Sequence, residues 1–333
     1  TNDTPSLYIR YAMPLAFLIL PWAFAGAFRG DLLPAMAFLT GGLVVFPCGL
    51  ALSKYVRRDS LQTSIYFIIM ISTSLFYLQL FSYYLLGTYI DYSSYLGDIS
   101  SRGYNRSLDY FRPHGIFQEP NGYSTITFCL LGLCLFLTKR RKRLEYAAIL
   151  SLALSLSVWG IVASILLFVL FNVHRLGRLV LGGFCTIILL IVWMVYFDLE
   201  GLIDGSITLS RMFNMQNDAS FAARLGGTKM FDAVLDLGFL FGHGINTSAF
   251  QHAFGANGVS FLIYSFGLIG SSLLFTFFLW SIKFDIKIVV LLGYLLSTYP
   301  PFSYMYFWFW LAMLVAFKQF EPVLRKNSHR IGI

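Results

Sequence analysis

The sequence has 333 residues, of which 57% are hydrophobic, 18% are aromatic and only 12% are charged, with a mean hydropathy of +0.70. Soluble domains carry about 25% charged residues, so this chain has too few polar side chains to cover soluble domains of its length. The composition therefore excludes a soluble protein and predicts an all-α polytopic membrane protein, with residues 1–333 forming a single integral membrane domain. In such a chain the net charge of +8 does not indicate nucleic-acid binding.

Apolar stretches long enough to cross about 30 Å of hydrocarbon recur along the chain. They cover residues 11–28, 32–52, 62–87, 122–138, 179–197, 259–281, 287–300 and 302–318. The last two are short, and Pro300 and Pro301 separate them at a tight reversal. We expect about eight to ten transmembrane helices in total.

The apolar stretch 146–171 fits two structures: one long helix, or two half-length helices broken around Ser155, Ser157 and Gly160. Loops rich in Lys and Arg face the cytoplasm, and such loops follow the second and fourth spans. These basic residues are Lys54, Arg57 and Arg58, and the run 139–143. A single crossing at 146–171 would place later basic residues outside, whereas a re-entrant helical hairpin keeps them inside. The hairpin is therefore favoured.

This topology leaves two long connections, residues 88–121 and 198–258, on the external side, where we expect the function to reside. The external basic residues are mostly arginines, whose guanidinium groups suit forked recognition of phosphate or carboxylate. These arginines are Arg29, Arg102, Arg106, Arg112, Arg211 and Arg224. Each one fits an ordinary surface ion pair, but the group as a whole favours an anionic ligand. The more numerous cytoplasmic basic residues are explained by orientation, with attraction to anionic membrane lipids as an addition.

The spans themselves carry little chemistry. No Asp, Glu, Lys or Arg lies in the middle of a predicted span, which argues against an ion-coupled carrier. The cysteines, Cys48, Cys129, Cys134 and Cys185, lie in apolar runs and form no disulfide framework or zinc motif, so no metal site is expected.

The first external loop ends in a cluster of polar groups beside the fourth span. Arg112, His114 and Glu119 lie within eight residues, between Pro113 and Pro120, which fix the turns. A carboxyl group beside apolar lipid could have a raised pKa suited to general-base work. An acid at this position is equally suited to capping the following helix, so both roles of Glu119 remain open.

The second external loop contains Asp218 and Ser220, either of which can cap a helix, and an amphipathic stretch, 228–237, expected to lie in the membrane interface. Arg224 would lie level with the lipid headgroups. It could extend to headgroup phosphate, as interfacial arginines commonly do, or bind a specific lipid pyrophosphate.

Farther along this loop, Phe241-Gly242-His243-Gly244 contains glycines that would let backbone amides approach a ligand. The segment is not a phosphate-binding P-loop, because no Gly-Lys-Ser/Thr follows. His252 could carry a proton or donate to a phosphate, although a plain hydrogen-bonding role is slightly favoured for a lone loop histidine.

Four motifs follow one another along the two external loops and into the span 259–281: Arg112-x-x-Gly115-x-Phe117-x-Glu119-Pro120-Asn121, Ser220-x-x-x-Arg224, Phe241-Gly242-x-Gly244, and Asn257 followed by Gly267-Leu268-Ile269-Gly270. Taken together, these motifs resemble the bacterial O-antigen polymerase family, within the wider O-antigen ligase/polymerase superfamily. The resemblance covers mainly residues 110–125 and 215–272, and it depends on the order and spacing of the motifs rather than on any one of them.

The resemblance implies a GT-C-like, metal-independent, inverting glycosyltransferase of the bacterial inner membrane, with its active site in the two periplasmic loops and no cofactor. Donor and acceptor would be oligosaccharide repeat units linked to undecaprenyl pyrophosphate, and a chain-length co-polymerase would be a further partner. Glu119 is the first candidate for the base and His252 the second, while Arg112, Arg211 and Arg224 would stabilise pyrophosphate. Further substrate contacts are expected from His114, Asn121, His243 and Asn257.

Three other functions compete with polymerisation, and the sequence leaves one of them, a non-catalytic partner role in polysaccharide assembly, fully open. An O-antigen ligase would transfer the glycan to lipid A core, but the ligase branch normally has a histidine immediately before the asparagine of the last motif, where this chain has Ala256. A lipid-linked oligosaccharide flippase or other carrier would need a polar cavity through the membrane, whereas the polarity here is concentrated on one side.

Overall fold

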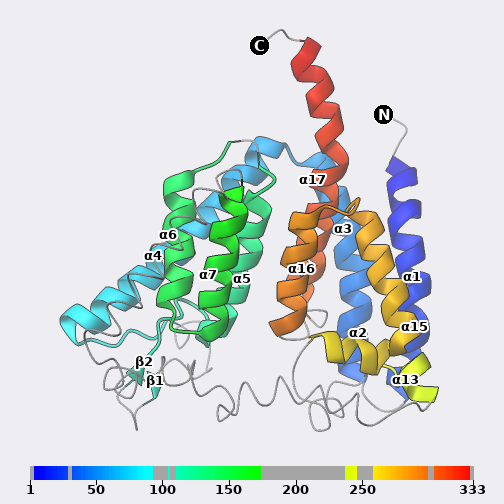
Figure 1. The fold of residues 1–333 in the computed structure, drawn as a ribbon, viewed down its shortest axis with the longest axis horizontal. Helices are drawn as coiled ribbons and strands as arrows, with labels where there is room; N and C mark the ends of the chain where they lie inside the picture. Colours follow the sequence, from blue (N-terminus) through cyan, green and yellow to red (C-terminus); the bar gives the residue numbers. More distant parts are fainter. Residues whose placement is uncertain are drawn as a thin grey trace, which may run out of the picture. The chain divides into compact units, whose positions relative to one another are not determined.

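A computed structural model describes residues 4–28, 32–92, 104–105, 110–137, 139–173, 237–245, 258–298 and 304–330. The sequence predicts one integral membrane domain, and the chain groups into two compact units (Figure 1). Unit 1 comprises Thr1–Leu61 and Ala219–Ile333, and unit 2 comprises Gln62–Asp218.

Both units are built from helices. Unit 1 contains α1 (Thr4–Phe28), α2 (Leu32–Leu39), the π-helical turn η1 (Thr40–Val45), α3 (Phe46–Tyr55), α13 (Leu237–Phe241), α15 (Gly258–Ser281), α16 (Ile286–Thr298) and α17 (Met305–Arg330). Unit 2 contains most of α4 (Arg58–Leu86), then α5 (Pro120–Cys134), α6 (Lys142–Leu154) and α7 (Val158–Phe171). The described exception to the helical structure is an antiparallel pair of two-residue strands, β1 (Tyr104–Asn105) and β2 (Tyr110–Phe111).

Four of the described helical segments are long and apolar enough to cross a membrane: Arg10–Phe28, Ala35–Ser53, Asp59–Leu86 and Gly258–Ser281. They confirm that the protein is a helical membrane protein, and they coincide with four of the predicted spans. The helix α5 has 15 residues and a length of about 23 Å, so it is shorter than the predicted span 122–138. The predicted span 179–197 lies outside the described residues. The count of eight to ten helices and the GT-C-like architecture stay predictions.

The break predicted within residues 146–171 is confirmed. The chain ends α6 at Leu154 and begins α7 at Val158, and Leu156 between them has a left-handed φ of 52°. The two helices pack against each other, and Gly160 lies so close to Ser155 that a Cβ atom there would approach its Oγ to 2.4 Å. The small residues that suggested the break therefore permit the close approach of the two arms. A re-entrant position in the membrane stays a prediction.

In unit 1, glycines let one helix approach another closely. The ring of Trp308 on α17 is fully buried and lies where a side chain at Gly41 of η1 would be, so a Cβ atom at Gly41 would collide with the indole ring. Farther along the chain, Gly49 of α3 faces Ala312 of α17. In lipid, apolar burial alone contributes little free energy to the association of helices. Small residues at the interface stabilise the packing because they let the helices approach closely.

The two ends of α4 bind different loops of unit 2. Near the start of the helix, Tyr66 contacts the α5–α6 loop, and nearer its end Gln79 contacts the loop that follows β2. These two side chains are separated by 13 positions, or about 20 Å along the helix axis. The basic loop 139–143 and the polar segment 112–119 therefore lie at opposite ends of this unit (Figure 1). This is the arrangement that the predicted topology requires.

Candidate functional site

The segment between β2 and α5 contains Arg112, His114 and Glu119, and one side chain from α4 holds it in place. Gln79 is fully buried, and its Oε1 accepts hydrogen bonds from the backbone N–H groups of His114 and Gly115, both at 2.8 Å. Its Nε2 donates to the carbonyl of Ile90 at 2.8 Å. A single amide therefore ties two loop segments to the end of α4.

These backbone bonds also determine the orientation of the Gln79 amide. If the amide were flipped, its NH2 group would face two N–H donors, so the oxygen must be the group on that side. The Nε2 of Gln79 then lies 3.5 Å from the Nε2 of His114. Because Gln79 can only donate there, the neutral imidazole accepts at Nε2 and carries its proton on Nδ1.

The His114 ring is fully buried, and among the described residues its Nδ1 has no hydrogen-bond partner. Burial lowers the pKa of His114 below its usual value of 6.5, and Arg112 nearby acts in the same direction, whereas Asp91 acts against it. The imidazole is therefore held neutral inside the loop. The contact of His114 with substrate stays a prediction, and the burial of the ring favours a positioning role.

An aromatic wall, formed by Phe111 and the rings that contact it, lies at the start of the segment. Phe111 is buried, and its ring centroid lies 4.6 Å from that of Tyr83, 5.3 Å from that of Tyr89 and 6.2 Å from that of His114. The hydroxyl of Tyr84 donates to the Phe111 carbonyl at 3.0 Å. The wall and the Gln79 hydrogen bonds together fix the backbone on either side of Arg112, which is itself half-buried.

Glu119 occupies the N-cap position of α5, with an extended backbone and Pro120 as the first helical residue. Its carbonyl accepts the first helical hydrogen bond, from Tyr123 at 3.2 Å. Within the described segment 110–137 its carboxylate makes no capping hydrogen bond, and the side chain is exposed. The backbone of Glu119 thus occupies the N-cap position, as the capping role requires, but its carboxylate makes no capping bond and stays accessible for chemistry.

Asn121 lies in the first turn of α5, two residues after Glu119. Its side chain is partly buried, and its Oδ1 has no hydrogen-bond partner among the described residues. A buried acceptor without a donor costs free energy, so a donor from outside the described residues would stabilise it. The predicted contact of Asn121 with substrate stays a prediction.

The second motif, Phe241-Gly242-His243-Gly244, is used differently from the prediction. The backbone N–H of His243 donates to the Tyr264 carbonyl at 2.8 Å, and that of Gly244 donates to the Ser265 carbonyl at 3.0 Å. The N–H of Ile245 donates to the Trp22 carbonyl at 3.2 Å. The expectation that amides of this motif approach a ligand is therefore wrong for His243 and Gly244, because both are bonded to the protein backbone.

The segment 241–245 crosses α15 closely, and a break in that helix explains why. Gly267 has a φ of 67° and a ψ of 178°, which breaks the helix and leaves carbonyls in the preceding turn to find other donors. A Cβ at Gly267 would lie 2.3 Å from the Leu240 carbonyl oxygen, and one at Gly242 would lie 2.4 Å from the Ser265 carbonyl oxygen. Two of the sequence motifs thus meet here as a backbone crossing that only glycines permit.

His243 projects from this crossing and is half-buried. Its ring stacks on that of Tyr264, with centroids 4.7 Å apart and planes 8° from parallel. The geometry supports a packing role, and the predicted substrate contact stays a prediction.

The other predicted site residues, Arg211, Arg224, His252 and Asn257, lie outside the described residues. So do the capping residues Asp218 and Ser220 and most of the amphipathic stretch 228–237. Within the described ranges, no three His, Cys, Asp or Glu side chains converge on a point where a metal ion could bind.

Sequence reasoning missed Gln79, which organises the described part of the site. The available signal was an amide well inside an apolar span, since such a group is expensive in lipid unless it is bonded. Its partners are 35 and 36 positions later, and no local pattern connects them. Comparison of the chain with protein-family models, with curated proteins and with solved structures finds no match.

Proposed function

We propose that the protein is an O-antigen polymerase, a metal-independent and inverting glycosyltransferase of the bacterial inner membrane. It joins oligosaccharide repeat units linked to undecaprenyl pyrophosphate into a polysaccharide at the periplasmic face. The proposal starts from the motif resemblance, and the local geometry of residues 110–121 supports it.

The observation that carries the proposal is the arrangement around Glu119. Its carboxylate is exposed and makes no capping bond, although its backbone is fixed by Pro120 and by the hydrogen bond from Tyr123. A general base needs such a fixed and accessible carboxylate within reach of the hydroxyl that it deprotonates. This segment also lies at the end of unit 2 opposite the basic loop, as a periplasmic site in the predicted topology requires.

In the proposed reaction, the hydroxyl oxygen of the acceptor sugar attacks the anomeric carbon of the donor glycan, and Glu119 accepts the hydroxyl proton. The new glycosidic bond forms as the bond between the anomeric carbon and the pyrophosphate oxygen breaks. Undecaprenyl pyrophosphate leaves with the electron pair, and attack from the opposite face inverts the configuration. Arg112 is the described candidate for stabilising the charge on the leaving group.

Gln79 and His114 act as positioning residues in this scheme. The Oε1 of Gln79 determines the path of the backbone between Arg112 and Glu119, because it accepts hydrogen bonds from the N–H groups of His114 and Gly115. The buried His114 ring packs beside the same amide. Fixed side chains matter because a small displacement of a catalytic group costs much of its rate advantage.

The proposal is tested in cells that depend on this protein for long-chain lipopolysaccharide. Glu119→Gln and Arg112→Ala should insert normally but leave single repeat units on the lipid A core, because ligation continues without chain growth. Gln118→Ala is the matched control, since it removes an exposed side chain next to Glu119 and should keep the long-chain ladder. Normal ladders from both site variants would contradict the proposal.

The same experiment separates the alternatives. A ligase defect would leave long chains on the lipid carrier and none on the core. A flippase defect would leave the repeat units in the cytoplasmic leaflet.

A further inference from the structure

The basic loop between α5 and α6 is built as a fixed structure rather than as a simple cluster of charges. Glu145 on α6 is fully buried, and its Oε2 accepts hydrogen bonds from the Nε and Nη2 atoms of Arg140, at 3.1 and 2.7 Å. Its Oε1 accepts a hydrogen bond from the hydroxyl of Tyr66 on α4. A buried carboxylate bonded in this way fixes the loop against both helices.

Further contacts hold the neighbouring residues. The Tyr66 hydroxyl accepts a hydrogen bond from the backbone N–H of Arg141 at 3.0 Å, and the Arg141 guanidinium lies 5.4 Å from the Tyr66 ring centroid. The Arg140 guanidinium lies 4.3 Å from the ring centroid of Phe171, at the end of α7. Orientation in the membrane requires positive charge but no fixed conformation, so topology alone does not explain this structure.

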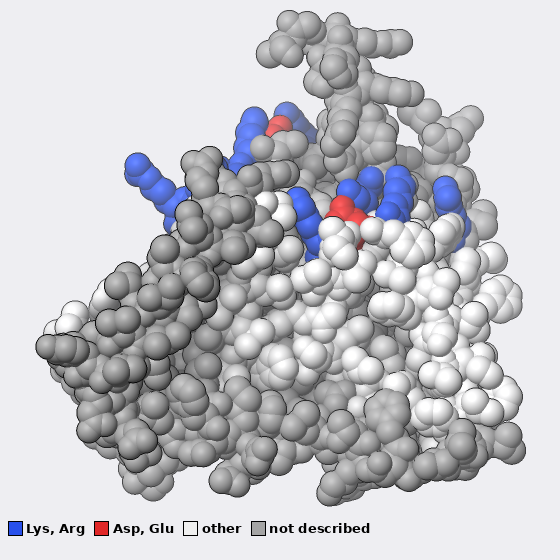
Figure 2. Space-filling model, in the orientation of Figure 1, with Lys and Arg blue, Asp and Glu red and all other residues white. Residues whose placement is uncertain are grey.

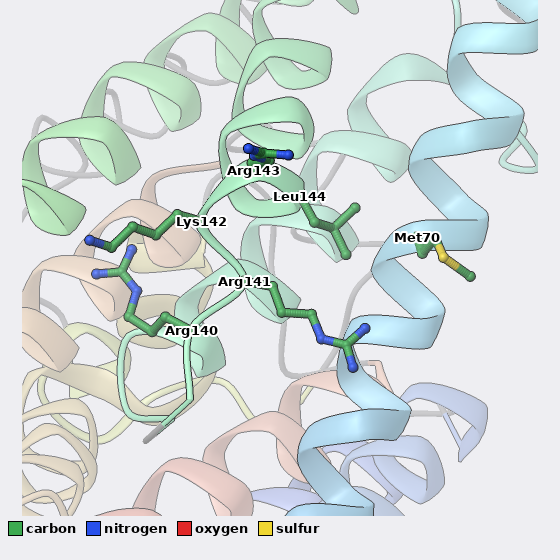
Figure 3. Close-up of a pocket in the computed structure, with 6 residues that line it drawn as sticks. All are labelled: Met70, Arg140, Arg141, Lys142, Arg143 and Leu144. Carbon is green, nitrogen blue, oxygen red and sulfur yellow. The ribbon is translucent and has the colours of Figure 1, made fainter.

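The fixed loop forms a pocket of about 580 Å³ on the surface of unit 2. Its lining residues are Met70, Arg140, Arg141, Lys142, Arg143 and Leu144 (Figure 3). Arg141 extends from the loop toward α4, whereas Arg140 and Lys142 extend to the other side. Four of the six lining side chains are cationic, and the Glu145 carboxylate neutralises one of them, so the pocket has a strong positive potential.

The apolar side of the pocket continues onto the lipid-facing surface of α4. Met70 is 43% exposed, and Phe67, Ile68 and Ile71 on the same helix are exposed as well. Figure 2 shows described Lys and Arg side chains next to described uncharged surface on this face of the molecule. A ligand of the pocket can therefore combine an anionic group with a hydrocarbon chain.

We propose that this pocket binds the phosphate-containing headgroup of an anionic phospholipid from the cytoplasmic leaflet. Arg141, which extends toward α4, holds the phosphate, Lys142 and Arg143 add positive potential around it, and an acyl chain lies along α4 beside Met70. The first turn of α6, which begins at Lys142, adds backbone potential of the same sign. This site is independent of the proposed polymerase activity, which belongs to the opposite end of unit 2.

The test uses the detergent-purified full chain, titrated with phosphatidylglycerol and with phosphatidylcholine of the same acyl chains, and bound lipid is counted by native mass spectrometry. The wild-type protein should prefer phosphatidylglycerol. The double variant Lys142→Gln/Arg143→Gln should weaken phosphatidylglycerol binding by about 30-fold, because each of the two cations near anionic lipid contributes about fivefold. Its thermal unfolding should not change, since both side chains are exposed.

The matched control is Arg57→Gln/Lys283→Gln, which removes two cations from other connections on the same predicted side. It should leave phosphatidylglycerol binding unchanged, and an equal loss in both double variants would overturn the proposal in favour of diffuse attraction. Equal binding of the two lipids would also overturn it. Displacement of phosphatidylglycerol by millimolar glycerol phosphate would assign the pocket to a soluble phosphate compound instead of a lipid.

Discussion

The two motif-bearing connections, residues 111–119 and 241–245, are held by opposite means. A side chain, Gln79, holds the first one, and the polar group of Glu119 remains exposed. The second one is held through its own backbone, with successive N–H groups donating to carbonyls of α15 and α1. A glycine-containing motif next to a span can therefore serve chemistry or packing, and the destination of its backbone hydrogen bonds distinguishes the two.

This difference gives the two segments separate expected roles. The segment 111–119 is a candidate for reaction chemistry, whereas 241–245 is part of the framework that lets α15 break at Gly267. Changes in the framework should affect folding first, and changes in Glu119 should affect activity without affecting folding.

The largest effect on stability is expected from Gly267→Ala. The new Cβ would lie 2.3 Å from the Leu240 carbonyl oxygen, and the residue would have to keep a φ of 67°. We expect a loss of about 3 to 5 kcal/mol in the free energy of unfolding, from steric and conformational strain together. Tryptophan fluorescence during thermal unfolding measures this, since Trp22 packs on Phe266 and Gly270.

Gly87→Ala is the matched control for this substitution. Gly87 has the same φ of 67°, but among the described residues no atom lies within 4 Å of the position of its Cβ. Only the conformational cost remains, about 1 kcal/mol. Equal losses from the two variants would show that the crossing of 241–245 with α15 is not tightly packed.

A smaller effect is expected from Gln79→Leu, which leaves the N–H groups of His114 and Gly115 and the carbonyl of Ile90 without their partner. Stranding these buried groups should cost about 3 kcal/mol, and amide hydrogen exchange at residues 114 and 115 should accelerate. Polymerisation should also fall, because Glu119 loses its fixed position.

The control for this prediction is Gln62→Leu at the other end of α4, where one hydrogen bond, to the Lys139 carbonyl, is lost. It should cost about 1 kcal/mol and leave exchange at residues 114 and 115 unchanged. Unchanged amide exchange at residues 114 and 115 in Gln79→Leu itself would refute the proposed role of Gln79 in holding this loop.

A still smaller effect concerns pH. Burial lowers the pKa of His114 in the folded protein, so the unfolded chain binds the proton more readily. The stability linked to His114 is therefore complete above about pH 6.5 and is lost as the pH falls through the unfolded value toward the folded one. His114→Asn should reduce the fall in melting temperature between pH 7.5 and pH 5, and an identical fall in both proteins would contradict a buried neutral imidazole.

The smallest effect on stability is expected from Glu119→Gln. The carboxylate makes no capping hydrogen bond, so the free energy of unfolding should change by less than about 0.5 kcal/mol. Thermal unfolding of the variant beside Gln118→Ala tests this directly. A loss of about 1 kcal/mol or more would favour the capping role that the sequence alone leaves open.

Sequence patterns predicted the features that depend on local composition. Apolar length predicted the four long spans, and Ser155, Ser157 and Gly160 predicted the break between α6 and α7. The position of Glu119 immediately before a helix also followed from the sequence, because Pro120 is suited to the first helical position.

Features that depend on distant partners could not be predicted. Gly242 and Gly267 are both visible as motif residues, but their contact requires the break in α15, which no local pattern specifies. Gln79 lies in an apolar span, and nothing near it indicates that it bonds His114. The sequence therefore indicated the important residues, but it did not indicate whether each of them has a structural or a functional role.

The most direct test of the proposed role of Glu119 is chain growth in vitro. The purified protein is incubated with undecaprenyl-pyrophosphate-linked repeat units, with and without a chelator, and product length is followed over time. Wild type and Gln118→Ala should extend chains at the same rate in both conditions, whereas Glu119→Gln, folded equally well, should be slower by about 100-fold or more. Wild-type rates from Glu119→Gln, or no chain growth by the wild-type protein, would contradict the account.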